Sequence, residues 1–289
     1  MPAEYKDIVS YHKSLNNETI ARWVAMKLGL GTHHCLVLDG PMCRTSAELL
    51  ERKLSKPHMI YAPQFNKRDA IKMKNRNMCN VFPMTLSQAV ANVDDGGIPA
   101  SIMAKISVFN FDYMGSVFGR RGTSPSNPEI YPLTDLMDCL EKTKKKDIIV
   151  SITVSDRLGS KISLEKKFFE GREGNFGKQL DKDFFIPVFN YNQFQMVKGQ
   201  FYCYSREQGP EPVAVAPGRS RYGRPVKAGG FNTSPAKKPK SAKMWFFIYH
   251  LRKDQSLDPE TVDFALSPME GEESYIWGFN PSRPDSHAE

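Results

Sequence analysis

The sequence of 289 residues lacks most features of secreted and membrane proteins. No apolar run approaches the about 18 residues that a membrane span needs, and the first residues contain no apolar signal core. The cysteines are odd in number and include no C-x-x-C pair, which argues against a disulfide framework and a zinc site; they are Cys35, Cys43, Cys79, Cys139 and Cys203. We therefore expect an intracellular protein, in the cytoplasm or nucleus, that spans no membrane.

Glycine-rich phosphate loops and metal-ligand clusters are also missing. The sequence has no G-x-G-x-x-G, and the glycines of "EGREGNFG" (170–177) do not stand between a strand and a helix. We expect a mobile loop there, able to cover the strand ends as a lid. His33 and His34 have no third ligand at metal spacing, so no metal site is expected.

Positive charge, in contrast, is abundant and concentrated in one segment. The net charge is +8, and residues 205–243 hold nine basic and two acidic residues, or +7, together with six prolines and five glycines. Such a composition cannot bury enough apolar surface to fold, which predicts a flexible basic insertion between two strands. We expect it to bind phosphate groups of nucleic acid through Arg219, Arg221, Arg224, Lys237, Lys238 and Lys240.

The N-terminal part alternates between strand-like and helix-like patterns. A helical segment within residues 1–31 has Ile20, Trp23, Val24 and Leu28 on one face, and Asn16 or Asn17 is positioned to cap it. Apolar "CLVLD" then precedes the helical "TSAELLERKL", in which Thr45 and Glu48 have the spacing of a capping box. "ASIMAKISVFNFDYMGSV", with the strand ending at Asp112, "LTDLMDCLEKTKKK" and "DIIVSITVSDR" continue the alternation.

This alternation predicts one α/β domain over residues 1–289. We expect a doubly wound, mostly parallel, Rossmann-like sheet with helices on both faces. The C-terminal half lacks a clear helix and predicts antiparallel edge strands that form a hairpin, from "FFIPVFNYNQ", "FQMVKGQFYCYS" and "KMWFFIYHLRK". Residues 270–289 are expected to be a flexible tail.

Two predicted strands end in aspartate, Asp39 and Asp112. In an open α/β sheet, ligands bind at the carboxyl ends of the strands, so both residues are candidates for a site. Each could equally cap the turn or helix that follows it, and the sequence leaves the two interpretations open.

The order of these elements, with "LDG" after the first strand and "FNFDYMG" at the fourth, resembles the class I S-adenosylmethionine-dependent methyltransferases over roughly residues 35–251. The resemblance implies S-adenosylmethionine as the cofactor and an amine of a nucleic acid as the substrate. It implies that Asp112 orients the amine and that the aromatic Tyr113 stacks against the substrate. The cofactor residues that it implies, at the ends of the first three strands, are Asp39, Gly40, Arg44, Asn66 and Thr85.

The sequence departs from this family at three places. Pro41 removes a backbone donor from the first turn, and Met42 and Cys43 stand where the family has glycines. The second strand is followed by Gln64 and Asn66 in place of an acid, and the fourth has no proline. A catalytically inactive relative that binds nucleic acid or protein through its basic segment is therefore an alternative. A dehydrogenase is a weaker one, because G-x-G-x-x-G and the acid after the second strand are missing.

Overall fold

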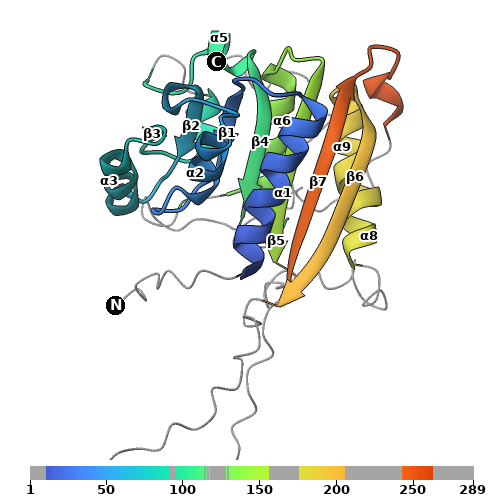
Figure 1. Cartoon of the computed structure of the whole chain (residues 1–289). Helices are drawn as coiled ribbons and strands as arrows, with labels where there is room; N and C mark the ends of the chain where they lie inside the picture. The colour runs from blue at the N-terminus through green and yellow to red at the C-terminus, as the bar shows by residue number, and fades with distance from the viewer. Residues whose placement is uncertain are drawn as a thin grey trace, which may run out of the picture.

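The computed structural model describes residues 11–91, 95–113, 115, 117, 128, 130–155, 176–205 and 243–262. Seven strands form one sheet in the order β3-β2-β1-β4-β5-β7-β6 (Figure 1). The first five strands are parallel, and β7 runs antiparallel to both β5 and β6. The strands are β1 (His34–Val37), β2 (Ile60–Pro63), β3 (Asn80–Phe82), β4 (Ile106–Asp112), β5 (Asp147–Ser155), β6 (Phe194–Ser205) and β7 (Lys243–Lys253).

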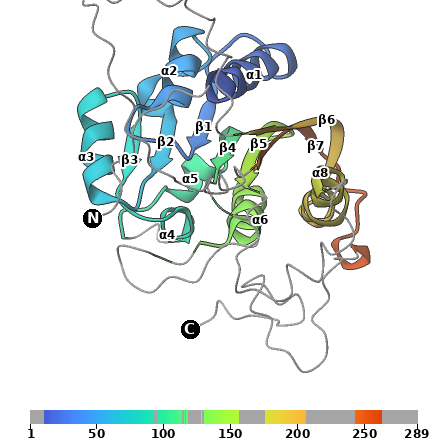
Figure 2. The ribbon, with the colours of Figure 1, turned by 90° about the horizontal axis from the view of Figure 1, so that it is seen from below.

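Helices cover both faces of this sheet (Figure 2). One face carries α1 (Tyr11–Lys27), α2 (Arg44–Glu51) and α3 (Lys67–Arg76). The other carries α4 (Leu86–Ala91), α5 (Ala100–Met103), α6 (Pro132–Lys142), α8 (Phe176–Leu180), the π-helical turn η2 (Asp181–Phe185) and α9 (Ile186–Tyr191). Two 3₁₀ turns, η1 (Pro57–Met59) and η3 (Pro259–Thr261), complete the described elements.

The core consists of two apolar layers, one on each face of the sheet. Along β5, Ile148 and Val150 belong to one layer and Ile149 to the other, because successive side chains of a strand point to opposite faces. Six of the seven residues of β4 are buried, as expected for a strand in the middle of a two-sided sheet. The expected fold is therefore confirmed: a mostly parallel α/β sheet with the topology of the methyltransferase fold and an antiparallel C-terminal pair of strands.

Several local predictions were wrong. The first helix begins at Tyr11, so Asn16 and Asn17 lie inside it and cap nothing; both are buried and hydrogen-bonded to groups in other elements. "FFIPVFNYNQ" is helical and not a strand, since Phe185 and Phe189 are four residues apart and share one buried face. The expected strand "ASIMAKISVFNFDYMGSV" contains the short helix α5 before β4 begins at Ile106.

Strands β6 and β7 form the predicted hairpin at one edge of the sheet, paired from Phe194↔Lys253 to Ser205↔Lys243 with a register shift between Met196 and Lys198. The basic segment follows β6 and precedes β7 in the chain. Its candidate residues Arg219, Arg221, Arg224, Lys237, Lys238 and Lys240 lie outside the described residues, as does the expected tail at 270–289.

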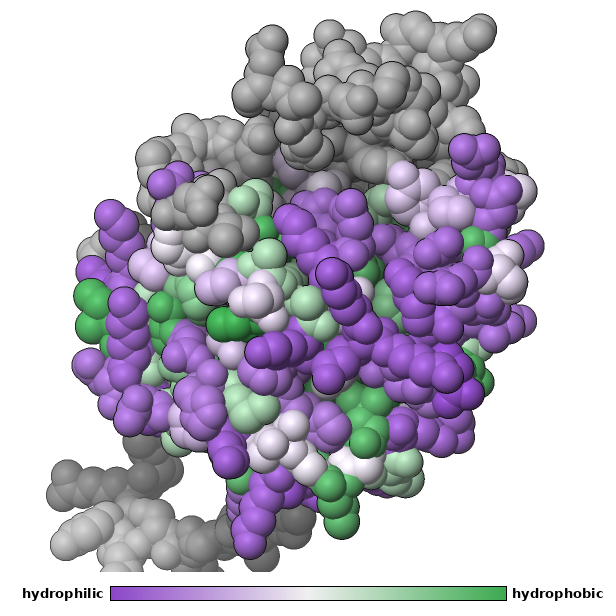
Figure 3. Space-filling model, turned by 90° about the horizontal axis from the view of Figure 1, so that it is seen from above, coloured by the Kyte–Doolittle hydropathy of each residue, from purple (hydrophilic) through white to green (hydrophobic). Residues whose placement is uncertain are grey.

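The edge of the sheet at which the parallel strands begin has a mainly hydrophilic surface, with apolar side chains in small separate groups (Figure 3). None of the helices in the described part of the chain has the length and apolarity to cross a bilayer.

Candidate functional site

A cavity of about 430 Å³ opens at the carboxyl ends of β1, β2 and β4. This volume lies within the range of small-molecule sites. Its polar lining comes from six elements or the loops beside them, and the residues with charged or amide side chains are Lys13, Asp39, Gln64, Asn66, Asp69, Asp112 and Asp135. Four of them are carboxylic acids and one is an amine, so the cavity is acidic although the chain as a whole is basic.

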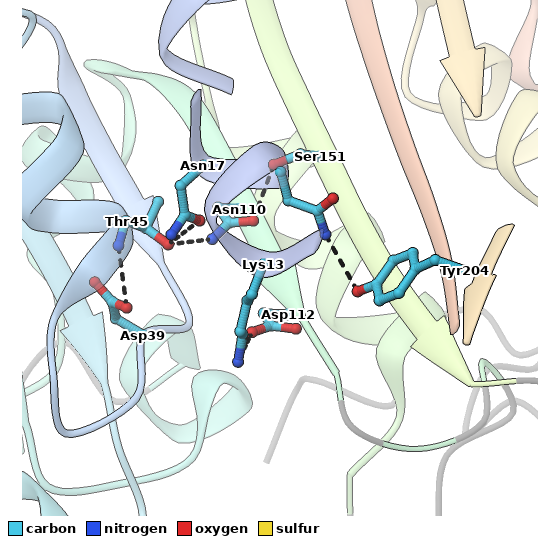
Figure 4. Close-up of polar contacts among 9 residues, drawn as sticks. Lys13, Asn17, Asp39, Thr45, Asn110, Asp112, Ser151 and Tyr204 are labelled. Atoms are coloured by element: carbon cyan, nitrogen blue, oxygen red, sulfur yellow. Dashed lines mark hydrogen bonds and ion pairs between the residues drawn. The ribbon is translucent and has the colours of Figure 1, made fainter. Parts of the chain in front are cut away.

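Asp112, the last residue of β4, forms an ion pair with Lys13 of α1 (Figure 4). Lys13 Nζ lies 2.7 Å from Asp112 Oδ2, and the two side chains are 34% and 15% exposed. The ion pair orients the carboxylate of Asp112. The sequence did not predict Lys13 as a site residue. It lies two turns before the apolar residues from which the first helix was predicted.

Asp39 follows β1 and caps α2 (Figure 4). Its Oδ2 accepts hydrogen bonds from the amide of Ser46 at 2.9 Å and from Ser46 Oγ at 2.8 Å, and its Oδ1 accepts one from the amide of Thr45 at 3.4 Å. Burial raises the pKa of Asp39 above its ordinary value, while these hydrogen bonds and Lys13 oppose that effect. Thr45 and Glu48 do not form the predicted capping box, because the Asp39 carboxylate occupies the end of the helix.

A chain of buried polar side chains beneath the cavity connects the helices to the sheet (Figure 4). Asn110 Nδ2 of β4 donates to Thr45 Oγ1 at 3.2 Å, and Thr45 donates to Asn17 Oδ1 of α1 at 3.1 Å. Ser151 of β5 donates to Asn110 Oδ1 at 3.0 Å. This network fixes α1 and α2 over β4, and so it places Lys13 beside Asp112.

Asp135 is a second site residue that the sequence did not predict. It belongs to α6, is 2% exposed, and accepts hydrogen bonds of 2.6 Å from Ser87 Oγ and from the Tyr113 hydroxyl. Burial raises the pKa of Asp135 to about 6. The apolar pattern of α6 did not predict that Asp135 is buried. Asp135 lies on the side of the helix opposite Leu133 and Leu140, and it is α4 that covers it.

The candidate Tyr113 is held tightly in the cavity wall. Its hydroxyl is engaged by Asp135, and its ring stacks on Phe111 with 6.2 Å between the centroids and 2° between the planes. Burial, followed by the charge of Asp135, raises the pKa of Tyr113 well above its ordinary value, so the phenol stays protonated. The ring is only 7% exposed and offers little surface for stacking.

The predicted residues after β2 and β3 line the cavity and also cap helices. Asn66 Oδ1 accepts from the amides of Arg68 and Asp69 at the start of α3. Thr85 forms a capping box with Gln88 at the start of α4, each side chain accepting from the other's amide. Asp69, one turn into α3, supplies a carboxylate near the end of β2 that the sequence pattern did not reveal.

The glycine-poor turn after β1 is closed by its own hydrogen bonds. The amide of Cys43 donates to the carbonyl of Gly40 at 2.8 Å, and Cys43 has the positive φ of 50° that a glycine would adopt more easily. Arg76 of α3 donates to the carbonyl of Pro41 at 3.0 Å and contacts Met42 Sδ. Gly40 leaves open space where a Cβ would stand.

The structure therefore brings together six of the seven predicted cofactor and catalytic residues: Asp39, Gly40, Asn66, Thr85, Asp112 and Tyr113. Arg44, the seventh, is the first residue of α2 and does not line the cavity. Among the residues that the structure describes, no group of three or more His, Cys, Asp or Glu side chains is arranged to hold a metal ion.

Comparison with known proteins gives distant structural similarities and no sequence match. No protein-family model and no curated protein matches the chain. A candidate methyltransferase from Thermoplasma acidophilum has 8% identity and a TM-score of 0.37, over 80% of this chain and 72% of that one. A candidate rRNA methylase from Clostridium thermocellum also has 8% identity and a TM-score of 0.37, over 80% and 95%. The plantazolicin methyltransferase BamL, solved with a triazolic desmethylPZN analogue and SAH, has 8% identity and a TM-score of 0.41, over 83% and 86%.

The strand order and the antiparallel strand β7 are those of the class I methyltransferase fold. Because fold alone does not determine activity, the function has to be argued from the cavity and its side chains.

Proposed function

We propose that this protein is an S-adenosylmethionine-dependent methyltransferase acting on an amine of a nucleic acid. The observation that carries the proposal is the acidic cavity at the carboxyl edge of the sheet, where Asp39, Asp69, Asp112 and Asp135 outnumber the cationic Lys13. S-adenosylmethionine is a cation at its sulfonium and its amino group, so a lining with excess negative charge favours it.

The described residues fit such a cofactor in two ways. Gly40 leaves space at the first turn, where a ligand approaches the backbone. Asp69 and Gln64 offer oxygen acceptors beside β2 for the two ribose hydroxyls, the role that the resemblance assigns to an acid after the second strand. When bound, the cofactor would supply a methyl group activated on sulfur.

Asp112 is the group that we expect to meet the substrate. Its carboxylate is oriented by the ion pair with Lys13 at the end of β4, and a carboxylate there accepts an N–H bond of an amine and aligns the nitrogen lone pair. Tyr113 is a positioning residue: bound to Asp135 and stacked on Phe111, it shapes the wall next to Asp112.

The basic segment supports a nucleic-acid substrate. It leaves β6 after Ser205 and returns at Lys243, and Met244 pairs with Ser155 at the carboxyl end of β5. The segment that carries most of the net charge is therefore attached at the same edge of the sheet as the cavity. Electrostatic attraction of a phosphate backbone toward that edge follows from this placement.

Isothermal titration with S-adenosylmethionine and S-adenosylhomocysteine tests the cofactor directly. We expect saturable heat for both ligands with the full chain, and at least about tenfold weaker binding for Asp69→Asn, since a charge-assisted hydrogen bond contributes about 1.5–3 kcal/mol. Glu51→Gln, an exposed acid on α2, is the matched control and should bind like the wild type.

A catalytically inactive, nucleic-acid-binding protein is the second candidate, favoured by two observations. Lys13 already engages Asp112, and three hydrogen bonds from the start of α2 already engage Asp39. This candidate replaces the first if titration gives no heat with either ligand while the protein still binds single-stranded or duplex nucleic acid.

A further inference from the structure

Helix α3, whose first turn borders the cavity, is strongly cationic. Its ten residues hold one acid, Asp69, and five basic residues, which are Lys67, Arg68, Lys72, Lys74 and Arg76. The helix therefore carries +4, the basic segment at 205–243 carries +7, and the rest of the chain carries −3. Outside the basic segment, the net positive charge of this protein thus comes from α3.

Most of these cations are available to a partner. Ala70 and Met73 are the buried residues of α3. The exposed surface of the helix includes Lys67, Arg68, Ile71 and Lys74. Among the residues that the structure describes, none of these three cations forms an ion pair, whereas Lys72 lies 3.7 Å from Asp69. Ile71 is 60% exposed, so the exposed surface combines positive charge with an apolar side chain.

The charges of α3 do not stabilise the helix that carries them. Lys67 and Arg68 stand in its first turn, where the helix dipole disfavours cations. Arg68, Lys72 and Arg76 follow one another at intervals of four residues, and like charges at that spacing repel each other on a helix. A cationic surface that works against its own helix indicates an anionic partner outside the chain.

The helix α3 and the basic segment flank the cavity on opposite sides (Figures 1 and 2). Asn66, the N-cap of α3, and Asp69 both line the cavity, so the first turn of the helix adjoins it. The basic segment leaves β6 and returns to β7, four strands from β2 in the order β2-β1-β4-β5-β7. Neighbouring strands are about 4.8 Å apart, which places β7 about 20 Å from β2. A polyanion bound at both places has to cross the cavity.

We propose that the exposed surface of α3 is a second phosphate-binding surface, which holds a nucleic acid on the side of the cavity opposite the basic segment. The inference rests on the nucleic-acid partner of the proposed function and names the part of the folded domain that meets it. Lys67, Arg68 and Lys74 bind phosphate groups, and Ile71 contacts a sugar or a base. The acidic lining of the cavity repels phosphate, so the backbone passes over the mouth and a neutral base enters.

Fluorescence anisotropy of the full chain with labelled single-stranded RNA, and with DNA of the same sequence, tests this surface. The variant Lys67→Gln/Arg68→Gln/Lys74→Gln removes three of the proposed contacts. We expect it to bind at least about tenfold more weakly, and the slope of log K against log salt to flatten by about 0.7 for each lost contact, or about 2 in total. Its melting temperature should not fall, because the two cations of the first turn oppose the helix dipole.

The matched control is Lys144→Gln/Lys145→Gln/Lys146→Gln. It removes the same charge from three exposed lysines between α6 and β5, at the edge of the sheet opposite the cavity. It should bind within about twofold of the wild type, because charges more than about 10 Å from the nucleic acid are largely screened at 0.1 M salt.

The proposal is overturned if the two triple variants bind alike, or if the wild type binds neither RNA nor DNA. The anisotropy experiment needs no cofactor, so it is independent of the titration with S-adenosylmethionine. Saturable heat in that titration, together with equal binding of nucleic acid by the two triple variants, would overturn the α3 surface and leave the methyltransferase proposal standing.

Discussion

At the scale of single residues, the site depends on carboxylates whose environments differ sharply. Asp112 is partly exposed at the end of β4 and paired with Lys13, whereas Asp135 is buried and its pKa is raised to about 6. Groups of the same type with such different environments often serve different roles in one site. Both can be tested by substitutions that keep the shape of the side chain.

Asp135 should make stability depend on pH. Its pKa is raised from 3.8 unfolded to about 6 folded, so the folded state binds the proton more tightly. That contribution is complete below about pH 4 and is lost as the pH rises through 6, for a total of about 3 kcal/mol. We expect the difference in unfolding free energy between wild type and Asp135→Asn to fall by about this amount from pH 4 to pH 7, measured by urea denaturation. Parallel curves for the two proteins would contradict the assignment.

Asp112 should affect turnover more than folding. If it orients an amine, Asp112→Ala should lower methyl transfer by about 10²-fold or more, and Asp112→Asn, which keeps one acceptor, should lose less. Unchanged turnover with a lower melting temperature in Asp112→Ala would assign that residue a structural role.

Tyr113→Phe should instead destabilise the fold by about 1–3 kcal/mol, because it leaves the buried Asp135 with one donor fewer.

At the scale of elements, the contacts between helices and sheet decide where the site residues lie. The helix α8 approaches β7 so closely that a Cβ on Gly177 would stand 2.2 Å from Cζ3 of Trp245. Gly177 was expected in a mobile loop at 170–177; Phe176 and Gly177 are in fact helical, and residues 170–175 lie outside the described residues.

Gly177→Ala should therefore be strongly destabilising. The added methyl group has to displace a packed indole ring, which costs about 1–3 kcal/mol or more. Gly31→Ala is the matched control, since its Cβ would meet nothing within 4 Å and its φ is not positive. Thermal unfolding of the two variants measures the difference, and equal melting temperatures would show that the α8 contact is not tight in solution.

At the scale of the whole molecule, most of the net charge lies in a segment that belongs to none of the strands of the sheet. Residues 206–242 contain eight basic and two acidic residues, so their removal lowers the net charge by six, from +8 to +2. The two strands that they join are paired up to Ser205↔Lys243, where a short turn could replace them.

Replacing residues 206–242 with Asn-Gly should change the melting temperature by a few degrees at most. Nucleic-acid binding should weaken, and the slope of log K against log salt should flatten by about 0.7–0.9 for each phosphate group that the shortened protein no longer neutralises. Fluorescence anisotropy over a salt series measures both quantities. Unchanged affinity and slope would exclude the segment as the source of binding.

The sequence by itself determined the alternation of strands and helices, the two aspartates that end β1 and β4, and the charged insertion, because these depend on local periodicity and composition. The predicted helix boundaries were wrong where side chains expected to cap a helix bind distant partners instead, as Asn17 and Thr45 do. The predicted element type was wrong in α9, because its aromatic residues fit both a strand and a helix. Hydrophobic periodicity in the sequence gave no indication of Lys13, Asp69 or Asp135 as site residues. Only the tertiary structure decided them, because each owes its environment to a segment distant in the chain: α1 packed over β4, α3 placed beside the first turn, and α4 covering α6.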